Sequence, residues 1–133
     1  MKNAKERKAA IPSALEIPFS AILTLSQECW RLKRIAASLD KQREGPAFNY
    51  AIRQISALLT EQGIHIEDYA GHAYDPGMAP EVLDVVEDPA MAPGSSRIDE
   101  TLAATVTWKG LVVQQGQVVV RQATMQVAAK ENE

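Results

Sequence analysis

Cysteine is almost absent from this chain: Cys29 is the only one in 133 residues. A single cysteine cannot form an intramolecular disulfide, and it cannot contribute to a cluster of thiolate metal ligands. No activating partner for its thiol is visible nearby in the sequence. We therefore interpret Cys29 as a small hydrophobic residue on a helix rather than as a catalytic nucleophile.

Long hydrophobic runs and an excess of basic residues are also missing. No segment approaches the ~18 apolar residues that a membrane-spanning helix needs, and the start of the chain lacks the apolar core of a signal peptide. The formal net charge is −3, which argues against nucleic acid as the main partner because nucleic-acid-binding proteins usually carry a basic surface. We therefore expect a cytoplasmic protein that binds neither nucleic acid nor membrane.

The remaining composition is that of an ordinary folded chain, with 46% hydrophobic and 23% charged residues. Its length suits one compact domain, or two small parts that share a core. Residues 1–18 contain two prolines and a group of basic residues, so we expect a disordered basic tail there. The basic residues are Lys2, Lys5, Arg7 and Lys8.

A helical hairpin is predicted for residues 19–63. In two segments, 20–43 and 47–62, apolar residues recur at intervals of three and four, which lines one face of a helix. Glu44-Gly45-Pro46 separates the segments, because glycine can end a helix and proline can begin one. The apolar residues are Ile22, Leu25, Cys29, Leu32, Ala36 and Leu39 in the first helix, and Phe48, Ile52, Ile55 and Leu59 in the second.

Two helices alone cannot enclose both of these apolar stripes, and other apolar residues widen them sideways. The interpretation that we favour is a dimeric four-helix bundle, with these stripes as the dimer interface. The alternative is that the hairpin packs on the β-domain of its own chain. The residues that widen the stripes are Trp30, Ile35, Ala51 and Leu58.

The second half of the chain predicts strands and turns, so the fold class is α+β. Residues 64–80 form a connector rich in Gly, Pro and His, residues 81–128 a small, mostly antiparallel β-domain, and residues 129–133 a polar tail. Strands are predicted at residues 82–86, 102–108, 111–114, 117–120 and 124–127. Residues 88–100 indicate a surface loop, and Gln115-Gly116 a tight hairpin turn that requires positive φ.

Three short motifs follow one another through this region: Tyr74-Asp75-Pro76, Trp108-Lys109-Gly110 and Arg121-Gln122-Ala123. Their order resembles the C-terminal β-domain of GrpE, the nucleotide exchange factor of DnaK-type chaperones. In that family an aromatic-Asp-Pro opens the domain, a Lys-Gly enters a short hairpin, and an Arg-x-Ala leads into a last strand. Val127-Ala128 is similar to a Val-Ala near the family's C-terminus. The two predicted helices fit the family's two short helices, so the resemblance spans about residues 20–128.

The resemblance implies a homodimeric cochaperone for protein folding and the stress response. Such a protein docks its β-domain on the nucleotide-binding domain of a DnaK-type ATPase and promotes ADP release. It is not an enzyme and needs no cofactor. The implied partner-binding positions are Trp108, Lys109, Gln117, Arg121 and Val127. The residue types alone leave other interpretations open: Trp108 and Val127 suit a β-core, and Lys109 and Arg121 suit a solvated surface.

The chain also departs from the family pattern. The family's long N-terminal helix is missing, Leu111 stands where the family usually has Tyr, and Gln117 replaces a basic residue that is common after the hairpin turn. The loop 88–100 is longer than usual, and residues 78–81 keep only the acid of a His-Glu pair. These departures motivate an alternative, a dimeric binding or adaptor module of the GrpE fold without exchange activity.

Enzymatic and metal chemistry find little support in the sequence. His65 and His72 have acidic neighbours but lack a recognised metal-ligand spacing, so no metal site is predicted. The acids between Glu81 and Asp88 alternate loosely with valines, which indicates an exposed strand face rather than a catalytic carboxylate pair. We expect no enzyme, because no set of nucleophile, base and metal ligands is evident.

Overall fold

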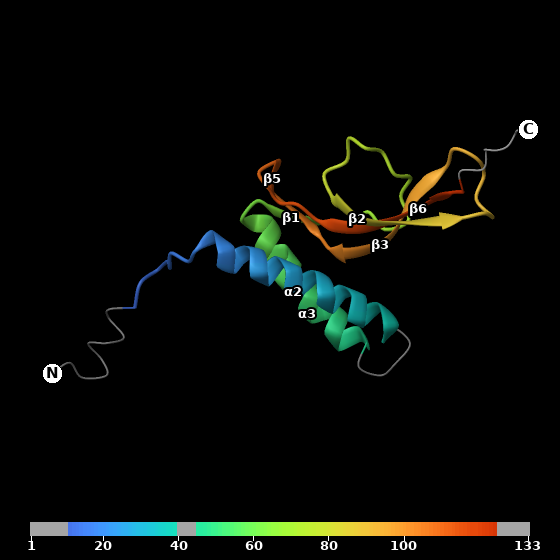
Figure 1. The fold of residues 1–133 in the computed structure, drawn as a ribbon. Coiled ribbons are helices and arrows are strands. Elements are labelled where there is room, and N and C mark those ends of the chain that lie inside the picture. The colour runs from blue at the N-terminus through green and yellow to red at the C-terminus, as the bar shows by residue number, and fades with distance from the viewer. Residues whose placement is uncertain (1–10, 40–44, 125–133) are drawn as a thin grey trace, which may run out of the picture.

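The computed structural model describes residues 11–39 and 45–124 (Figure 1). Two helices are followed by two three-stranded sheets, which confirms the α+β class. None of the helices in the described ranges is long and apolar enough to cross a membrane. The helices are α2 (Phe19–Ser38) and α3 (Gly45–Glu61), and the strands are β1 (Ile64–Glu67), β2 (Glu81–Asp88), β3 (Ser96–Ala103), β4 (Thr105–Trp108), β5 (Leu111–Gln114) and β6 (Gln117–Ala123).

Helices α2 and α3 lie side by side and form the predicted hairpin below the sheets (Figure 1). Helix α2 begins after Pro18, whose fixed φ suits a helix start, and the Ala21 N–H donates to the Pro18 carbonyl over 3.0 Å. It ends at Ser38, before the predicted end at residue 43. Residues 40–44 lie outside the described ranges. The spacing of apolar residues therefore predicted the positions of both helices correctly.

The first sheet has the strand order β1-β4-β5 and the second has the order β2-β6-β3. The pairs β1–β4, β4–β5 and β3–β6 are antiparallel, and β2 runs parallel to β6. The prediction of a mostly antiparallel β-domain is confirmed. The chain crosses between the sheets three times: between β1 and β2, at Ala104, and at Gln115-Gly116.

The predicted hairpin turn at Gln115-Gly116 is wrong, because β5 and β6 belong to different sheets. Gly116 does not have positive φ; it is required because a Cβ there would lie 2.7 Å from the Thr105 backbone nitrogen. The tight turn with positive φ is instead Lys109-Gly110, between β4 and β5, with φ of 50° and 85°. Two consecutive positive φ values match the twist of a two-residue hairpin.

Several strand boundaries also differ from prediction. The connector 64–80 begins with strand β1, which pairs with β4 and could be recognised only through that distant partner. The predicted loop 88–100 is shorter, since β2 continues to Asp88 and β3 begins at Ser96. The predicted strand 102–108 is interrupted at Ala104, where the Gln27 side chain takes the place of a neighbouring strand. Strand β6 continues through Arg121 to Ala123, and residues 125–127 of the last predicted strand lie outside the described ranges.

Two hydrophobic clusters hold the molecule together. The first joins both helices to the first sheet, and the second lies under the segment that follows β1, where Tyr69, Tyr74 and Met78 pack on β3 and β6. The alternative expectation, in which the hairpin packs on its own β-domain, is therefore realised within the single chain. The buried residues of the first cluster are Cys29, Ala36, Ile52, Leu59, Ile64 and Val106.

This packing changes the role of four residues that we expected at a dimer interface. Cys29 and Ala36 are 1% exposed, Ile52 is 5% exposed and Leu59 is 3% exposed, all within one chain. Side chains that are already buried have no surface left for a second copy. Ile22, Leu32 and Ile55 are half-buried against the same cluster, and Leu39 in the turn after α2 is half-buried.

Candidate functional site

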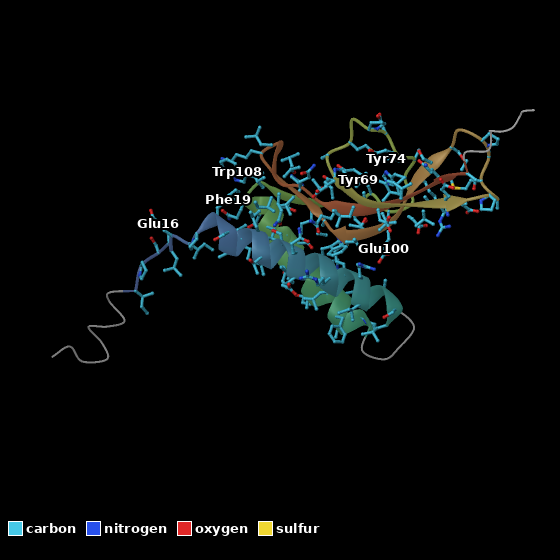
Figure 2. The ribbon with its side chains drawn as sticks, viewed as in Figure 1. Glu16, Phe19, Tyr69, Tyr74, Glu100 and Trp108 are labelled. Carbon is cyan, nitrogen blue, oxygen red and sulfur yellow. The ribbon has the colours of Figure 1, made fainter. Side chains whose placement is uncertain are left out.

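The turn after β4 carries two of the five residues that the resemblance singles out, Trp108 and Lys109. The Trp108 indole N–H donates to the Gln62 carbonyl over 3.2 Å, and its ring meets Phe19 edge to face at 5.8 Å (Figure 2). The Lys109 amino group lies 4.8 Å from the centre of the Trp108 ring. Trp108 thus packs on both helices and keeps only part of its ring accessible, while Lys109 is exposed.

The main chain fixes this turn to the helical hairpin. The Lys109 N–H donates to the Gly63 carbonyl over 2.9 Å. Gly63 has a φ of 85°, and a Cβ at this position would lie 3.0 Å from the Lys109 side chain. Glycine is therefore needed to end α3 and to let the turn approach closely. The Trp108-Lys109-Gly110 turn is a rigid feature at one end of the molecule.

An apolar groove of about 750 Å³ lies beside Trp108. Its walls come from the segment before α2, from the first turns of α2 and from the end of α3. Leu15 and Leu58 are 81% and 53% exposed there. The groove therefore offers a largely apolar surface next to the exposed Lys109. Further lining residues are Ile17, Phe19, Ile22 and Leu25.

The hairpin also presents three exposed apolar residues, Leu25, Phe48 and Leu58, together with the half-buried Leu32 and Ile55, and we call these five residues the apolar helix face. Leu25 and Leu32 are seven residues apart on α2, as are Phe48 and Ile55 on α3, and this spacing puts each pair on one side of its helix. Leu25 is 39% exposed and Phe48 is 41% exposed. Exposed apolar side chains grouped on a helical hairpin are a common feature of interaction sites.

Arg121 lies in the central strand of the second sheet and is held by carboxylates on both neighbouring strands. Its Nε and Nη2 donate to the two Asp99 oxygens on β3 over 2.9 and 3.2 Å. Its Nη1 lies 3.6 Å from the Asp88 carboxylate on β2. The hydrogen bond from Arg121 lowers the pKa of Asp99, and the hydrogen bond to Asp99 raises the pKa of Arg121. Its predicted role against an acidic partner surface is therefore weakened, since the guanidinium already has acidic partners.

The other predicted positions are not gathered around the turn. Gln117 begins β6 and pairs with both Glu81 and Ala103, so it lies inside the second sheet rather than at the tip of a hairpin. Val127 lies outside the described residues. Asp75 accepts the Gly77 N–H over 2.9 Å and thereby shapes the turn before β2, as the Asp-Pro sequence predicts.

Sequence reasoning missed a polar contact that connects α2 to both sheets. The Asp68 carboxylate, just after β1, accepts the Trp30 indole N–H over 2.7 Å and the Thr101 hydroxyl over 2.6 Å. Burial raises the pKa of Asp68, but the hydrogen bonds from Thr101, Trp30 and the Ala70 N–H outweigh it, so the pKa is lowered overall. The position of Trp30 beside the helix seam was the available signal, because a buried indole N–H needs an acceptor.

Arg34 extends this contact along α2. Its guanidinium lies 5.0 Å from the centre of the Trp30 ring, and its Nη1 donates to the Thr101 carbonyl over 3.1 Å. Together Trp30, Arg34, Asp68 and Thr101 form a cluster that we call the Asp68 clasp. The clasp sets the position of the second sheet relative to the helical hairpin.

Within residues 11–39 and 45–124, no group of three or more His, Cys, Asp or Glu side chains could hold a metal ion. His65 lies on β1 and is exposed, and His72 meets Tyr69 edge to face at 5.8 Å. The two histidines therefore do not meet each other at a common site.

No protein-family model matches this chain. No curated protein matches it either.

Proposed function

We propose that this chain is a GrpE-like cochaperone that docks its β-domain on a DnaK-type chaperone ATPase and promotes ADP release. The observation that carries the proposal is the order of the elements: a helical hairpin is followed by a small β-domain, with the Lys109-Gly110 turn at one end and Arg121 in its central strand. This is the order that the sequence resemblance implies. A factor that prefers the open form of an ATPase must lower its nucleotide affinity.

The proposed docking surface is centred on the Trp108-Lys109-Gly110 turn. Support comes from its rigidity, since Gly63 and Gln62 hold it by main-chain acceptors. Lys109 supplies a positive charge and Trp108 a partly exposed aromatic ring, and these properties are common at binding hot spots. A turn that is already ordered loses little conformational entropy on docking.

The proposal includes a homodimer formed through the apolar helix face. Leu25, Phe48 and Leu58 are exposed there, and a second copy would bury them in a four-helix arrangement. This interface is narrower than the sequence predicts, because the buried seam residues are already used inside the chain. A twofold axis along the face would bring identical stripes together.

In the direct test, purified DnaK-type chaperones are loaded with a fluorescent ADP analogue and mixed with this protein in a stopped-flow instrument. The measured quantity is the rate at which the analogue is released. We expect faster release that saturates with protein concentration. Lys109→Ala should reduce the acceleration, and Lys33→Ala, a change of the same type on an exposed part of α2, should not. Unchanged release from every DnaK-type chaperone of the host, at saturating protein, would refute the exchange activity.

One observation favours a second function, a dimeric adaptor of the same fold without exchange activity. Arg121 is neutralised by Asp99 and Asp88, and Gln117 is paired inside a sheet, so two of the implied contacts with an ATPase are weakened. A co-sedimentation assay with the same chaperones separates the two functions. Binding without faster ADP release would favour the adaptor.

A further inference from the structure

The second sheet has two outer edges, and the described part of the chain covers only one of them. On β3, the residues after Tyr69 supply the missing partner: Gly71 donates to the Ile98 carbonyl and Ile98 donates to the His72 carbonyl, both over 2.8 Å. Strand β2 forms the opposite edge and pairs with β6 alone. Within the described ranges, no main-chain hydrogen bond outside the β2–β6 ladder involves residues 82–87.

The protection of this edge comes from acidic side chains and a bulge, which disfavour a second copy more than a basic strand. Natural edge strands are usually short, or carry charges or proline, which discourage the pairing of another chain. Strand β2 has 8 residues, with no lysine and no proline among them, and a bulge at Leu83 is its one irregularity. Leu83 and Val85 are 48% and 45% exposed. The two edge strands of the first sheet, β1 and β5, have only 4 residues each.

The charges along β2 indicate what kind of strand could be added. Glu81, Asp84 and Glu87 are exposed, and none of them forms an ion pair with another described residue. Asp88, by contrast, is paired with Arg121. Two copies of β2 placed edge to edge would bring these carboxylates together, which disfavours a second copy as the occupant. A strand with Lys or Arg beside these acids would be favoured.

The main chain at Val85 is compatible with such an addition. Its N–H donates to the neighbouring Asp84 carboxylate over 2.9 Å, so a side chain of the same strand already binds this donor. A basic side chain that pairs with Asp84 would free the Val85 N–H for a carbonyl of the added strand.

We propose that the outer edge of β2 binds an extended basic segment of a partner protein as an additional strand, with Leu83 and Val85 contacting its aliphatic side chains and Glu81, Asp84 and Glu87 contacting its Lys or Arg side chains. Main-chain hydrogen bonds supply affinity in this mode, and alternate side chains supply specificity. The inference does not depend on nucleotide exchange, because β2 is separate from the proposed ATPase-binding turn.

The test uses the full chain, labelled with ¹⁵N, and a short synthetic peptide in which Lys and Val alternate. We expect amide shifts concentrated at residues 81–88 and at β6, and weaker binding as salt is raised. A peptide with Glu in place of Lys should not bind. Equal binding of both peptides, or shifts centred on the apolar groove instead of β2, would overturn the proposal.

Two pairs of variants separate strand addition from simple charge attraction. Val85→Pro removes a main-chain N–H of the edge strand and should weaken peptide binding about tenfold, whereas Val85→Thr keeps the donor and should bind like the original chain. Glu81→Gln with Glu87→Gln should weaken binding several-fold. The matched control, Glu16→Gln with Glu61→Gln, changes net charge equally away from β2 and should not.

The amide spectrum and circular dichroism of each variant report whether the fold is kept. If Val85→Pro does not fold, the comparison of the two glutamine pairs still decides the outcome. Full binding by the Glu81/Glu87 variant would refute the proposed contacts, as would full binding by a folded Val85→Pro variant. A concentration-dependent dimer that Val85→Pro abolishes would also refute them, because a second copy would then occupy the edge.

Discussion

Asp68 shows how much of this fold depends on a single carboxylate. It lies after β1, yet it accepts hydrogen bonds from Trp30 on α2 and Thr101 on β3. Trp30 is 3% exposed, so its indole N–H has little access to water once Asp68 is removed. A buried donor that loses its acceptor is penalised more strongly than an exposed one.

We therefore expect Asp68→Ala to lower the free energy of unfolding by about 1–3 kcal/mol, since it leaves the buried indole N–H without an acceptor. Chemical denaturation monitored by tryptophan fluorescence measures the change. A double-mutant cycle with Trp30→Phe isolates the contact, and a coupling energy near zero would contradict this account. Glu61→Ala, an exposed carboxylate at the end of α3, serves as the control and should change stability little.

The same carboxylate predicts a pH dependence. The pKa of folded Asp68 lies below its ordinary value of 3.8. A depressed pKa in the folded state means that the stabilisation is fully present above the unfolded pKa and is lost as pH falls through the folded pKa. Stability measured from pH 7 downward should therefore fall below about pH 4, with a shallower fall in Asp68→Asn. Parallel curves for the two proteins would contradict the assignment.

Gly116 makes a second prediction at the level of one residue. A Cβ at this position would lie 2.7 Å from the Thr105 nitrogen and 2.8 Å from the Ala103 carbonyl oxygen, both backbone atoms that cannot move aside easily. Gly116→Ala should therefore destabilise the protein by at least about 2 kcal/mol, as overpacking does. Gly77→Ala is the matched control, because its Cβ would meet only the Asp75 carboxylate at 3.6 Å. Equal melting temperatures for the two variants would contradict the expectation.

Among the elements, the helices followed from the sequence and several strands did not. Helix α2 and helix α3 were found from the spacing of their own apolar residues, which is local information. Strand β1 depends on its register with β4, where Ile64 faces Trp108. The expected turn at Gln115-Gly116 failed because Gly116 is required for close packing against Thr105, and a sequence does not distinguish that need from positive φ.

The candidate site likewise combines residues that the sequence pointed to with contacts that it did not predict. The resemblance implied that Lys109-Gly110 enters a short hairpin, and both residues have positive φ. The ion pairs of Arg121 with Asp99 and Asp88 were not foreseen, because they join three strands that lie far apart in the chain. The Asp68 clasp was missed for the same reason.

The Gln27 side chain on α2 makes the main-chain hydrogen bonds that a neighbouring strand would otherwise make. Its amide donates to the Ala104 carbonyl over 2.7 Å and accepts the Ala104 N–H over 3.0 Å, where the chain passes from β3 to β4. Ala104 is fully buried, so both of its main-chain groups depend on this one side chain.

Gln27→Ala should consequently destabilise the protein by about 2–4 kcal/mol, because it leaves a buried donor and a buried acceptor without partners. Amide hydrogen exchange should show the largest loss of protection at Ala104 and in the strands beside it. Gln54→Ala, at an exposed position on α3, provides the control. Protection at Ala104 that survives in Gln27→Ala would mean that water or another group replaces the glutamine.

For the molecule as a whole, charge is divided between its two parts. The described helices carry Arg31, Lys33, Arg34 and Arg53 against two acids, Glu28 and Glu61. Residues 64–124 carry nine acids against three basic residues, Arg97, Lys109 and Arg121. Lys109 is the exposed cation at the proposed ATPase-binding turn, and the open edge of β2 is acidic. The two proposed surfaces therefore select partners of opposite charge, which lets both be occupied without competition.

The apolar helix face makes the last prediction, which concerns assembly. Leu58 is 53% exposed in the single chain, so Leu58→Glu should cost the folded monomer little burial of apolar surface. In the proposed dimer, the same change would place a charge inside the interface. We expect sedimentation equilibrium to show a dimer for the original chain and a monomer for Leu58→Glu, with unfolding of the isolated chain little changed. Ala57→Glu is the control, because it adds the same charge at the neighbouring position and should remain dimeric. The turns next to Ala57 carry polar residues on that side of α3: Arg53, Gln54, Thr60 and Glu61. If the original chain is a monomer at all accessible concentrations, the apolar helix face serves another partner, and exchange activity would have to come from a single copy.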